Sequence, residues 1–198
     1  LIKAINQNKD VTWLIDEAFI EFTENPEENS LAPHLSDLKN LILVRSLTKS
    51  WNIPGLRLGF AASSNQQLIA DLTKIQIPWS INGITIAWAE QFLNKKHSDI
   101  ITQSLQLYQV IRNKFYSQLN KIMWLKAYPS KTNFFLVKVE APNINVDTLF
   151  NHLIKNGILV RKLGALEGFT EGEFFRVAIR DQEDNQRLIN TLKNLKSS

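Results

Sequence analysis

Three short, almost continuous apolar runs near the start of the chain constrain its fold more than any other feature of the sequence. They occupy residues 11–15, 41–44 and 56–62. Apolar runs of this length are typical of strands that are buried on both faces, as in a parallel sheet covered by helices. Residues 66–76 and 83–93 read as helices, so this part of the chain is predicted to be α/β with a mostly parallel sheet.

The order of elements changes after a long helix predicted at residues 98–119, whose apolar side chains recur at spacings of three and four along one face. The following segments predict strands at 123–127 and 134–139, a helix at 146–155, strands at 158–161 and 174–179, and a helix at 181–195. This order indicates a small α+β domain. We therefore predict two domains, at residues 1–110 and 111–198, with their boundary inside the long helix.

Composition excludes several kinds of site and partner. The chain has no cysteine, so disulfides and thiolate metal ligands are ruled out, and its three histidines lack metal-ligand spacing; no metal is expected. The 23 basic and 19 acidic residues form no basic stripe interleaved with aromatic residues, which argues against a nucleic-acid partner. No apolar run approaches the roughly 20 residues that cross a bilayer, so no membrane partner is expected. The absence of cysteine fits a cytoplasmic location, which we expect.

Charged and hydroxyl side chains follow the first two apolar runs. Asp16 comes directly after the first run, and the sequence Ser-Leu-Thr-Lys follows the second run and ends at Lys49. Ligands of parallel α/β sheets gather at the carboxyl ends of the strands, so Asp16 and Lys49 are expected at one edge. Taken singly, Asp16 could cap a helix and Lys49 could face water. Their joint spacing favours a ligand site.

The segments at residues 16–19, 46–49 and 54–59 resemble the fold type I class I/II aminotransferases, whose cofactor is pyridoxal 5′-phosphate (PLP). The resemblance implies that Lys49 is the catalytic lysine, whose amine condenses with the cofactor aldehyde. It implies that Asp16 keeps the pyridine nitrogen protonated, which makes the ring an electron sink. Ser46, Thr48 and Arg57 would bind the cofactor phosphate, with Arg57 as a forked donor.

The same resemblance implies the PLP-transferase fold type I. Residues 1–110 would be the C-terminal part of the PLP-binding large domain, and residues 111–198 the small C-terminal domain. The segment at 175–180 resembles the one that carries the family's carboxylate-binding arginine, which is Arg176 here. Arg161 would add charge for that carboxylate or for a substrate phosphate. The simpler alternative is that both arginines face water at strand ends.

Within the family, the segments at 46–49 and 78–82 look most like threonine-phosphate decarboxylases, and the chain as a whole also resembles histidinol-phosphate aminotransferases. We therefore expect an L-threonine-O-3-phosphate decarboxylase of cobalamin biosynthesis, acting on a small amino-acid phosphate as a homodimer. The first alternative is a histidinol-phosphate aminotransferase that uses 2-oxoglutarate. The second is a truncated remnant without catalysis.

Some features depart from the family pattern or are open to a simpler interpretation. Phe19 stands where many of these aminotransferases have tyrosine, and it cannot donate a hydrogen bond to the cofactor. The sequence begins at Leu1 and is interpreted as a C-terminal fragment without the family's N-terminal phosphate loop; alone, it is expected to be inactive. Asn82 is expected to cap a helix, although it could approach the site of a neighbouring subunit. The tryptophans 79, 88 and 124 are expected in the core or an interface.

Overall fold

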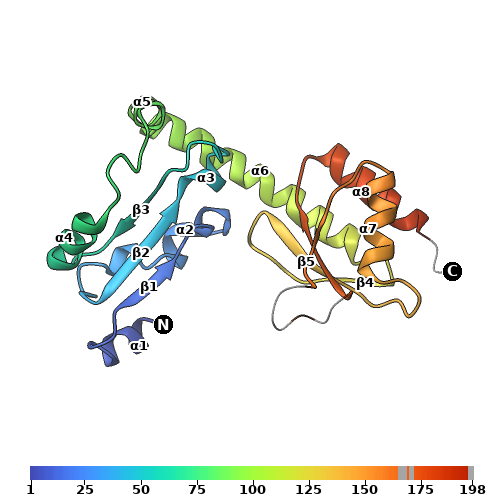
Figure 1. Cartoon of the computed structure of the whole chain (residues 1–198), viewed down its shortest axis with the longest axis horizontal. Helices are drawn as coiled ribbons and strands as arrows, with labels where there is room; N and C mark the ends of the chain where they lie inside the picture. The colour runs from blue at the N-terminus through green and yellow to red at the C-terminus, as the bar shows by residue number, and fades with distance from the viewer. Residues whose placement is uncertain (165–168, 170–171, 196–198) are drawn as a thin grey trace. The chain divides into compact units, whose positions relative to one another are not determined.

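The computed structural model describes residues 1–164, 169 and 172–195. The chain divides into two compact units, Leu1–Gln106 and Leu107–Ser198. The long helix α6 (Lys95–Leu119) contributes residues to both units (Figure 1). The division falls inside α6, as does the domain boundary predicted from the sequence, residues 110/111.

The first unit is built on a three-stranded sheet in the order β1-β2-β3, formed by β1 (Trp13–Asp16), β2 (Leu41–Ser46) and β3 (Gly59–Ala62). β1 and β2 are parallel, with Asp16 opposite Val44. β3 pairs with β2 in the antiparallel sense, with Gly59 opposite Ser46. This sheet is therefore mixed, whereas the sequence predicted a mostly parallel one. The connection from β2 to β3 holds only a single-turn helix, which is too little for a parallel crossover.

Short helices surround this sheet. They are α1 (Ile2–Gln7), η1 (Ile20–Phe22), α2 (Pro26–Asn29), η2 (Ala32–His34), α3 (Leu47–Ser50), α4 (Gln66–Ile75) and α5 (Gly83–Phe92). α4 and α5 begin where asparagine side chains accept hydrogen bonds from the backbone N–H groups of the first turn, as Asn82 does from Thr85. A small cluster of buried side chains lies between α1 and the sheet: Ile5, Leu31, Leu38, Leu41 and Leu43.

Burial in this sheet is less complete than the sequence predicts. β2 buries its first three side chains, but Leu14 of β1 and Phe60 of β3 remain exposed. The prediction that all three strands are buried on both faces was therefore wrong for β1 and β3. An apolar run fixes the preference of a strand for burial, but the covering elements must come from elsewhere in the protein.

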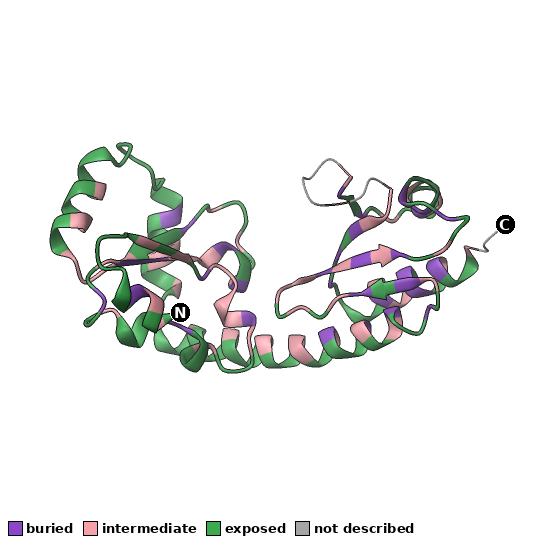
Figure 2. Ribbon diagram, turned by 90° about the horizontal axis from the view of Figure 1, so that it is seen from below, coloured by how far each residue is buried: buried purple, intermediate pink, exposed green. Residues whose placement is uncertain are grey.

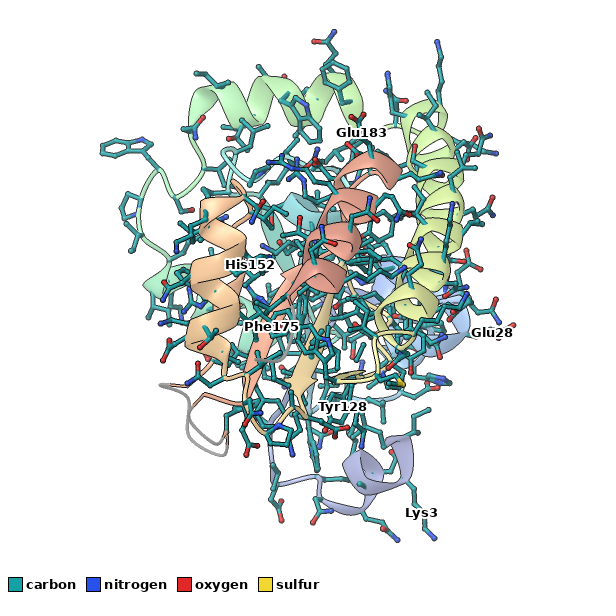
Figure 3. The ribbon with its side chains drawn as sticks, turned by 90° about the vertical axis from the view of Figure 1, so that its right-hand side faces the viewer. Lys3, Glu28, Tyr128, His152, Phe175 and Glu183 are labelled. Carbon is teal, nitrogen blue, oxygen red and sulfur yellow. The ribbon has the colours of Figure 1, made fainter. Side chains whose placement is uncertain are left out.

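The second unit has a four-stranded antiparallel sheet in the order β4-β5-β7-β6. Its strands are β4 (Leu125–Ala127), β5 (Phe134–Val139), β6 (Arg161–Lys162) and β7 (Phe174–Ala178). Helices α7 (Val146–Lys155) and α8 (Gln182–Asn194) and the last turns of α6 bury the alternate side chains of β5 and β7 in one core (Figures 2 and 3). Phe175 is fully buried in this core, whereas its neighbours Phe174 and Arg176 lie on the other face.

The strand predicted at 158–161 is shorter than expected. α7 ends at Lys155, and Gly157 just beyond it has a φ of +69°, which lets its N–H and that of Ile158 bond back to the carbonyls of Ile154 and Leu153. This capping geometry occupies the first residues of the predicted strand. β6 therefore begins only at Arg161. No helix in the described residues is long and apolar enough to cross a membrane.

Candidate functional site

Asp16 lies at the carboxyl end of β1, at the edge of the parallel pair. The N–H of Glu17 donates to the carbonyl of Val44 at 2.8 Å, so the β1–β2 pairing continues to this point. The carboxylate of Asp16 is exposed, and its Oδ1 accepts from the N–H of Ala18 at 2.8 Å. This local hydrogen bond orients the carboxylate and leaves Oδ2 without a protein partner in the described chain.

Lys49 follows the neighbouring strand on the single-turn helix α3. The flanking side chains Thr48 and Ser50 are buried, whereas that of Lys49 is exposed. Among the described residues no carboxylate or carbonyl pairs with the Lys49 amine. Just before it, the hydroxyls of Ser46 and Thr48 form a hydrogen bond of 2.6 Å. The strand end thus presents one amine and two linked hydroxyl groups.

Arg57 is carried by a loop that is fastened to the same helix. The N–H of Leu47 donates to the carbonyl of Leu58 at 3.0 Å, and the N–H of Ile53 donates to that of Thr48 at 3.2 Å. Arg57 itself has a φ of +53°, which is unusual for a residue with a side chain and costs energy. Such strain collects at functional sites, where the surrounding structure maintains it. Lys49 and Arg57 therefore belong to one folded loop.

Two further contacts hold this loop, and the sequence indicated only the second, through a glycine that permits close backbone approach. Thr85 of α5 is fully buried, and its hydroxyl donates to the carbonyl of Leu56 at 2.9 Å. At Gly59, a Cβ atom would lie 2.6 Å from the carbonyl oxygen of Arg45. Only glycine therefore permits β3 to approach β2 this closely at the end of the Arg57 loop.

An ion pair between a buried carboxylate and a half-buried guanidinium joins the ends of the two parallel strands. Glu17 is 5% exposed, and its Oε2 accepts from Nε and Nη2 of Arg45 at 3.0 and 2.9 Å. The Ser30 hydroxyl also donates to this oxygen, and Oε1 accepts from the N–H of Leu31. These contacts satisfy the hydrogen-bonding capacity of both oxygens of the buried carboxylate. In the sequence, the only signal of this pair is a charged residue near the end of each strand.

Glu21 lies beside this ion pair, and its carboxylate has fewer polar contacts than that of Glu17. Its Oε1 is 4.0 Å from Nη1 of Arg45, and its buried Oε2 has no hydrogen-bond partner in the described part of the chain. Burial raises the pKa of Glu21, and the attraction of Arg45 only partly opposes this effect.

In the second unit, the structure brings Arg161 and Arg176 together. They are register partners on the antiparallel strands β6 and β7, and both are exposed. Opposite residues of an antiparallel pair have their side chains on the same face, so the two guanidinium groups share one side of the sheet. No acceptor in the described residues bonds to either group. Arg176 lies over the ring of Phe134, with 4.7 Å between Cζ and the ring centroid.

The other residues considered for the site make contacts that stabilise the fold. Asn82 caps α5, which confirms the capping interpretation. Phe19 packs against Phe22, with 6.0 Å between the ring centroids. His97 and His152 make contacts with Asn94 and with the Thr191 carbonyl, and no three metal-ligating side chains are grouped in the described residues.

The tryptophans divide into two kinds. Trp88 packs edge-on against Trp51, and Trp124 lies against the core of the second unit. Trp79 is 94% exposed, so a core position for it was wrong.

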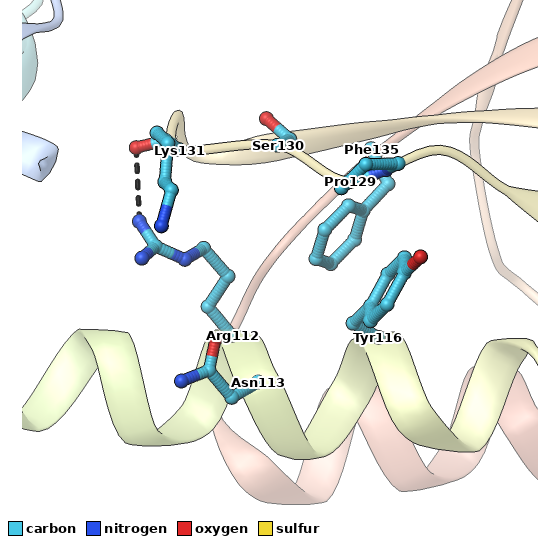
Figure 4. Close-up of a pocket in the computed structure, with 7 residues that line it drawn as sticks. All are labelled: Arg112, Asn113, Tyr116, Pro129, Ser130, Lys131 and Phe135. Carbon is cyan, nitrogen blue, oxygen red and sulfur yellow. Dashed lines mark hydrogen bonds between the residues drawn. The ribbon is translucent and has the colours of Figure 1, made fainter.

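A separate pocket of about 240 Å³ lies in the second unit between α6 and the turn before β5 (Figure 4). Its floor is aromatic, from Tyr116 and Phe135, whose ring centroids are 5.5 Å apart. Arg112 lies at the edge of this pocket and is 1% exposed. Its Nη1 donates a hydrogen bond to the carbonyl of Lys131 at 2.9 Å. None of the residues predicted for cofactor or substrate lines this pocket.

Comparison with known proteins places this arrangement in a family. The family model for aminotransferase class I and II matches residues 1–192. Histidinol-phosphate aminotransferase from Thermoanaerobacter sp. is 32% identical over 98% of this chain and 51% of its own length. Threonine-phosphate decarboxylase from Salmonella typhimurium is 32% identical over 93% of this chain and 49% of its own.

A solved structure agrees with these relatives. The histidinol-phosphate aminotransferase from Clostridium acetobutylicum has a TM-score of 0.89 and 30% identity, and the match covers 98% of this chain and 57% of that one. The chain spans about half the length of the curated relatives it matches. With residues 1–192 matched, the chain belongs to the class I and II aminotransferase family.

Proposed function

We propose that this chain belongs to a PLP-dependent enzyme that acts on a phosphorylated amino acid and decarboxylates L-threonine-O-3-phosphate. One observation carries the cofactor assignment: Asp16 ends β1 and Lys49 follows the end of β2, the adjacent parallel strand. The family of the chain supports the same cofactor. The reaction and the substrate are proposals for the whole protein.

The residues at this edge fit PLP. Lys49 presents an amine without a partner among the described residues, and Asp16 presents a carboxylate oriented by the Ala18 N–H. When bound, PLP supplies an electron sink for a bond that breaks at the substrate α-carbon. Asp16 would hold the proton on the pyridine nitrogen, and Lys49 would bind the aldehyde carbon and move protons through Nζ. Ser46, Thr48 and Arg57 would donate to the phosphate.

Arg161 and Arg176 would bind the anionic groups of the substrate. Like charges placed opposite each other on neighbouring strands repel, and both guanidinium groups lack an acceptor in the described chain. A bound carboxylate or phosphate would relieve this repulsion and use the free N–H groups. A forked contact from Arg176 to the α-carboxylate would fix the orientation of the substrate.

The choice between decarboxylation and transamination depends on substrate pose. By fixing the substrate carboxylate, Arg176 and Arg161 would decide whether the bound cofactor activates the bond from the α-carbon to the carboxylate or the bond from the α-carbon to hydrogen. The segments at 46–49 and 78–82 favour the decarboxylase. The alternative is a histidinol-phosphate aminotransferase, since relatives with both names match at 32% identity. A non-catalytic remnant is the second alternative, and we expect the 198-residue chain alone to be inactive.

We also propose that the full-length enzyme is a homodimer in the cytoplasm. Support comes from the end of α4 to the start of α5, where several large apolar side chains are exposed, among them Ile75, Ile77, Trp79 and Ile84. Exposed apolar side chains gathered in one segment are typical of an interaction surface.

The test of the proposed function uses the full-length enzyme and two matched lysine variants. Lys49→Ala should abolish the visible absorption of bound PLP and reduce turnover by about a thousandfold or more, because both the covalent link and the proton carrier are lost. Lys39→Ala removes an exposed lysine of the same unit and should leave both unchanged. Normal absorption and turnover in Lys49→Ala would refute the assignment.

The same preparation decides the reaction. Carbon dioxide release from threonine phosphate is compared with glutamate formation from histidinol phosphate and 2-oxoglutarate. Carbon dioxide release is expected. Glutamate formation without carbon dioxide would favour the aminotransferase.

A further inference from the structure

The contact between Arg176 and Phe134 follows from the register of the sheet. Phe134 is the first residue of β5 and lies opposite Ala178, whereas Arg176 lies opposite Leu136. Phe134 and Arg176 are therefore diagonal neighbours on the same face, at a separation that aromatic and long side chains can bridge. The 4.7 Å from Cζ to the ring centroid is within the range of an attractive cation–π contact.

The backbone that carries the ring is held from three directions. The hydroxyl of Thr132 donates to the carbonyl of Phe134 at 3.3 Å. The carbonyl of the preceding residue, Asn133, accepts from the N–H of Ile179 at 2.9 Å. The buried Arg112 bonds to the carbonyl of Lys131 in the turn before the strand (Figure 4). The backbone that carries the Phe134 ring is thus anchored, whereas Arg176 is an exposed side chain.

The geometry matters because the face and the edge of a guanidinium group do different things. A guanidinium group that contacts a ring with its face keeps its N–H donors, which lie in the plane of the group, available for a forked contact. A free arginine side chain also loses considerable rotamer entropy when it is fixed by a ligand. A ring that already restricts the side chain reduces this loss.

We propose that Phe134 is a positioning residue for Arg176: its ring holds the guanidinium by the face and presents the N–H edge to the substrate carboxylate. The proposal rests on the proposed role of Arg176 in carboxylate binding. It adds a residue from a different strand, which neither the lysine motif nor the arginine segment contains.

The experiment uses the full 198-residue chain with labelled arginine and acetate as the carboxylate probe. Side-chain NMR signals of Arg176 should show the upfield shift that an aromatic face produces, and acetate should perturb them. Phe134→Leu should remove the shift and weaken acetate binding about two- to fivefold, as expected for an exposed cation–π contact. Phe134→Tyr should keep both the upfield shift of the Arg176 signals and the affinity for acetate. Phe174→Leu is the matched control, because it makes the same change two residues before Arg176 on the same face.

The possible outcomes distinguish the positioning role of Phe134 from the carboxylate-binding role of Arg176. If Arg176→Gln binds acetate as well as the unchanged chain, the carboxylate role of Arg176 is wrong. If Arg176→Gln loses binding but Phe134→Leu retains the shift and the affinity, the positioning role is overturned and the carboxylate role stands. If Phe134→Leu does not fold, pentafluorophenylalanine at position 134 replaces it. This ring keeps its shape but has inverted electrostatics, so unchanged affinity would overturn the proposal.

Discussion

Glu21 shows how one side chain can make stability depend on pH. Burial raises its pKa, so between the ordinary value near 4.5 and the higher folded value the folded state binds more protons than the unfolded state. Its contribution is therefore fully present below the unfolded pKa and is lost as the pH rises through the folded pKa. Glu21→Gln should raise the free energy of unfolding at neutral pH by up to about 1 kcal/mol, since it removes a poorly solvated charge.

The measurement is urea unfolding of the 198-residue chain at several pH values from 4 to 7. Glu21→Gln should flatten the decline in stability above pH 4.5. Glu27→Gln makes the same change of charge at an exposed position and should keep the slope of the unchanged protein. If the free energy of unfolding of Glu21→Gln changes with pH as steeply as that of the unchanged protein, the Glu21 carboxylate is better solvated than its surroundings indicate.

At the scale of elements, one glycine controls how β3 joins the sheet. A Cβ atom at Gly59 would lie 2.6 Å from the Arg45 carbonyl oxygen, so Gly59→Ala must push β3 away from β2. We expect a loss of about 1–3 kcal/mol in the free energy of unfolding, as for other forced overpacking. Urea unfolding of the same chain measures this loss.

Gly55 provides the matched substitution. No atom outside its immediate neighbours lies within 4 Å of a Cβ built at Gly55, and its φ is not in the left-handed region. Gly55→Ala should therefore be neutral or slightly stabilising, because alanine restricts the unfolded chain. Equal effects of the two substitutions would mean that the close approach at Gly59 is not needed for the fold.

Some of these elements could be predicted from the sequence alone, and others could not. Helices α4, α5 and α7 were predictable because apolar spacing, asparagine caps and Gly157 are local signals. The direction of β3 was not predictable from the sequence, because its pairing with β2 depends on how the loop at 47–58 folds. At the site, Asp16 and Lys49 could be located from polar residues that end apolar runs. The Glu17–Arg45 and Thr85–Leu56 contacts could not, since their partners are 28 and 29 residues apart.

At the scale of the whole molecule, the two units differ in how much apolar surface they bury. The core of the second unit combines side chains from α6, α7, α8 and three strands. The core of the first unit is limited to the cluster around Ile5, Leu41 and Leu43. Exposed apolar side chains such as Leu14, Phe60 and Trp79 also belong to the first unit. Because stability rises with buried apolar area, the first unit should be the less stable one.

We therefore expect the 198-residue chain to unfold in two steps, with the first unit opening at lower temperature or urea concentration. Hydrogen exchange should be faster in β2 than in β5, although each lies inside its sheet. Leu43→Ala and Leu153→Ala each remove a buried leucine, one from each core, at a cost of about 2–5 kcal/mol. Leu43→Ala should lower only the first transition, and Leu153→Ala only the second. A single transition that both variants lower equally would mean that the two units fold as one cooperative body.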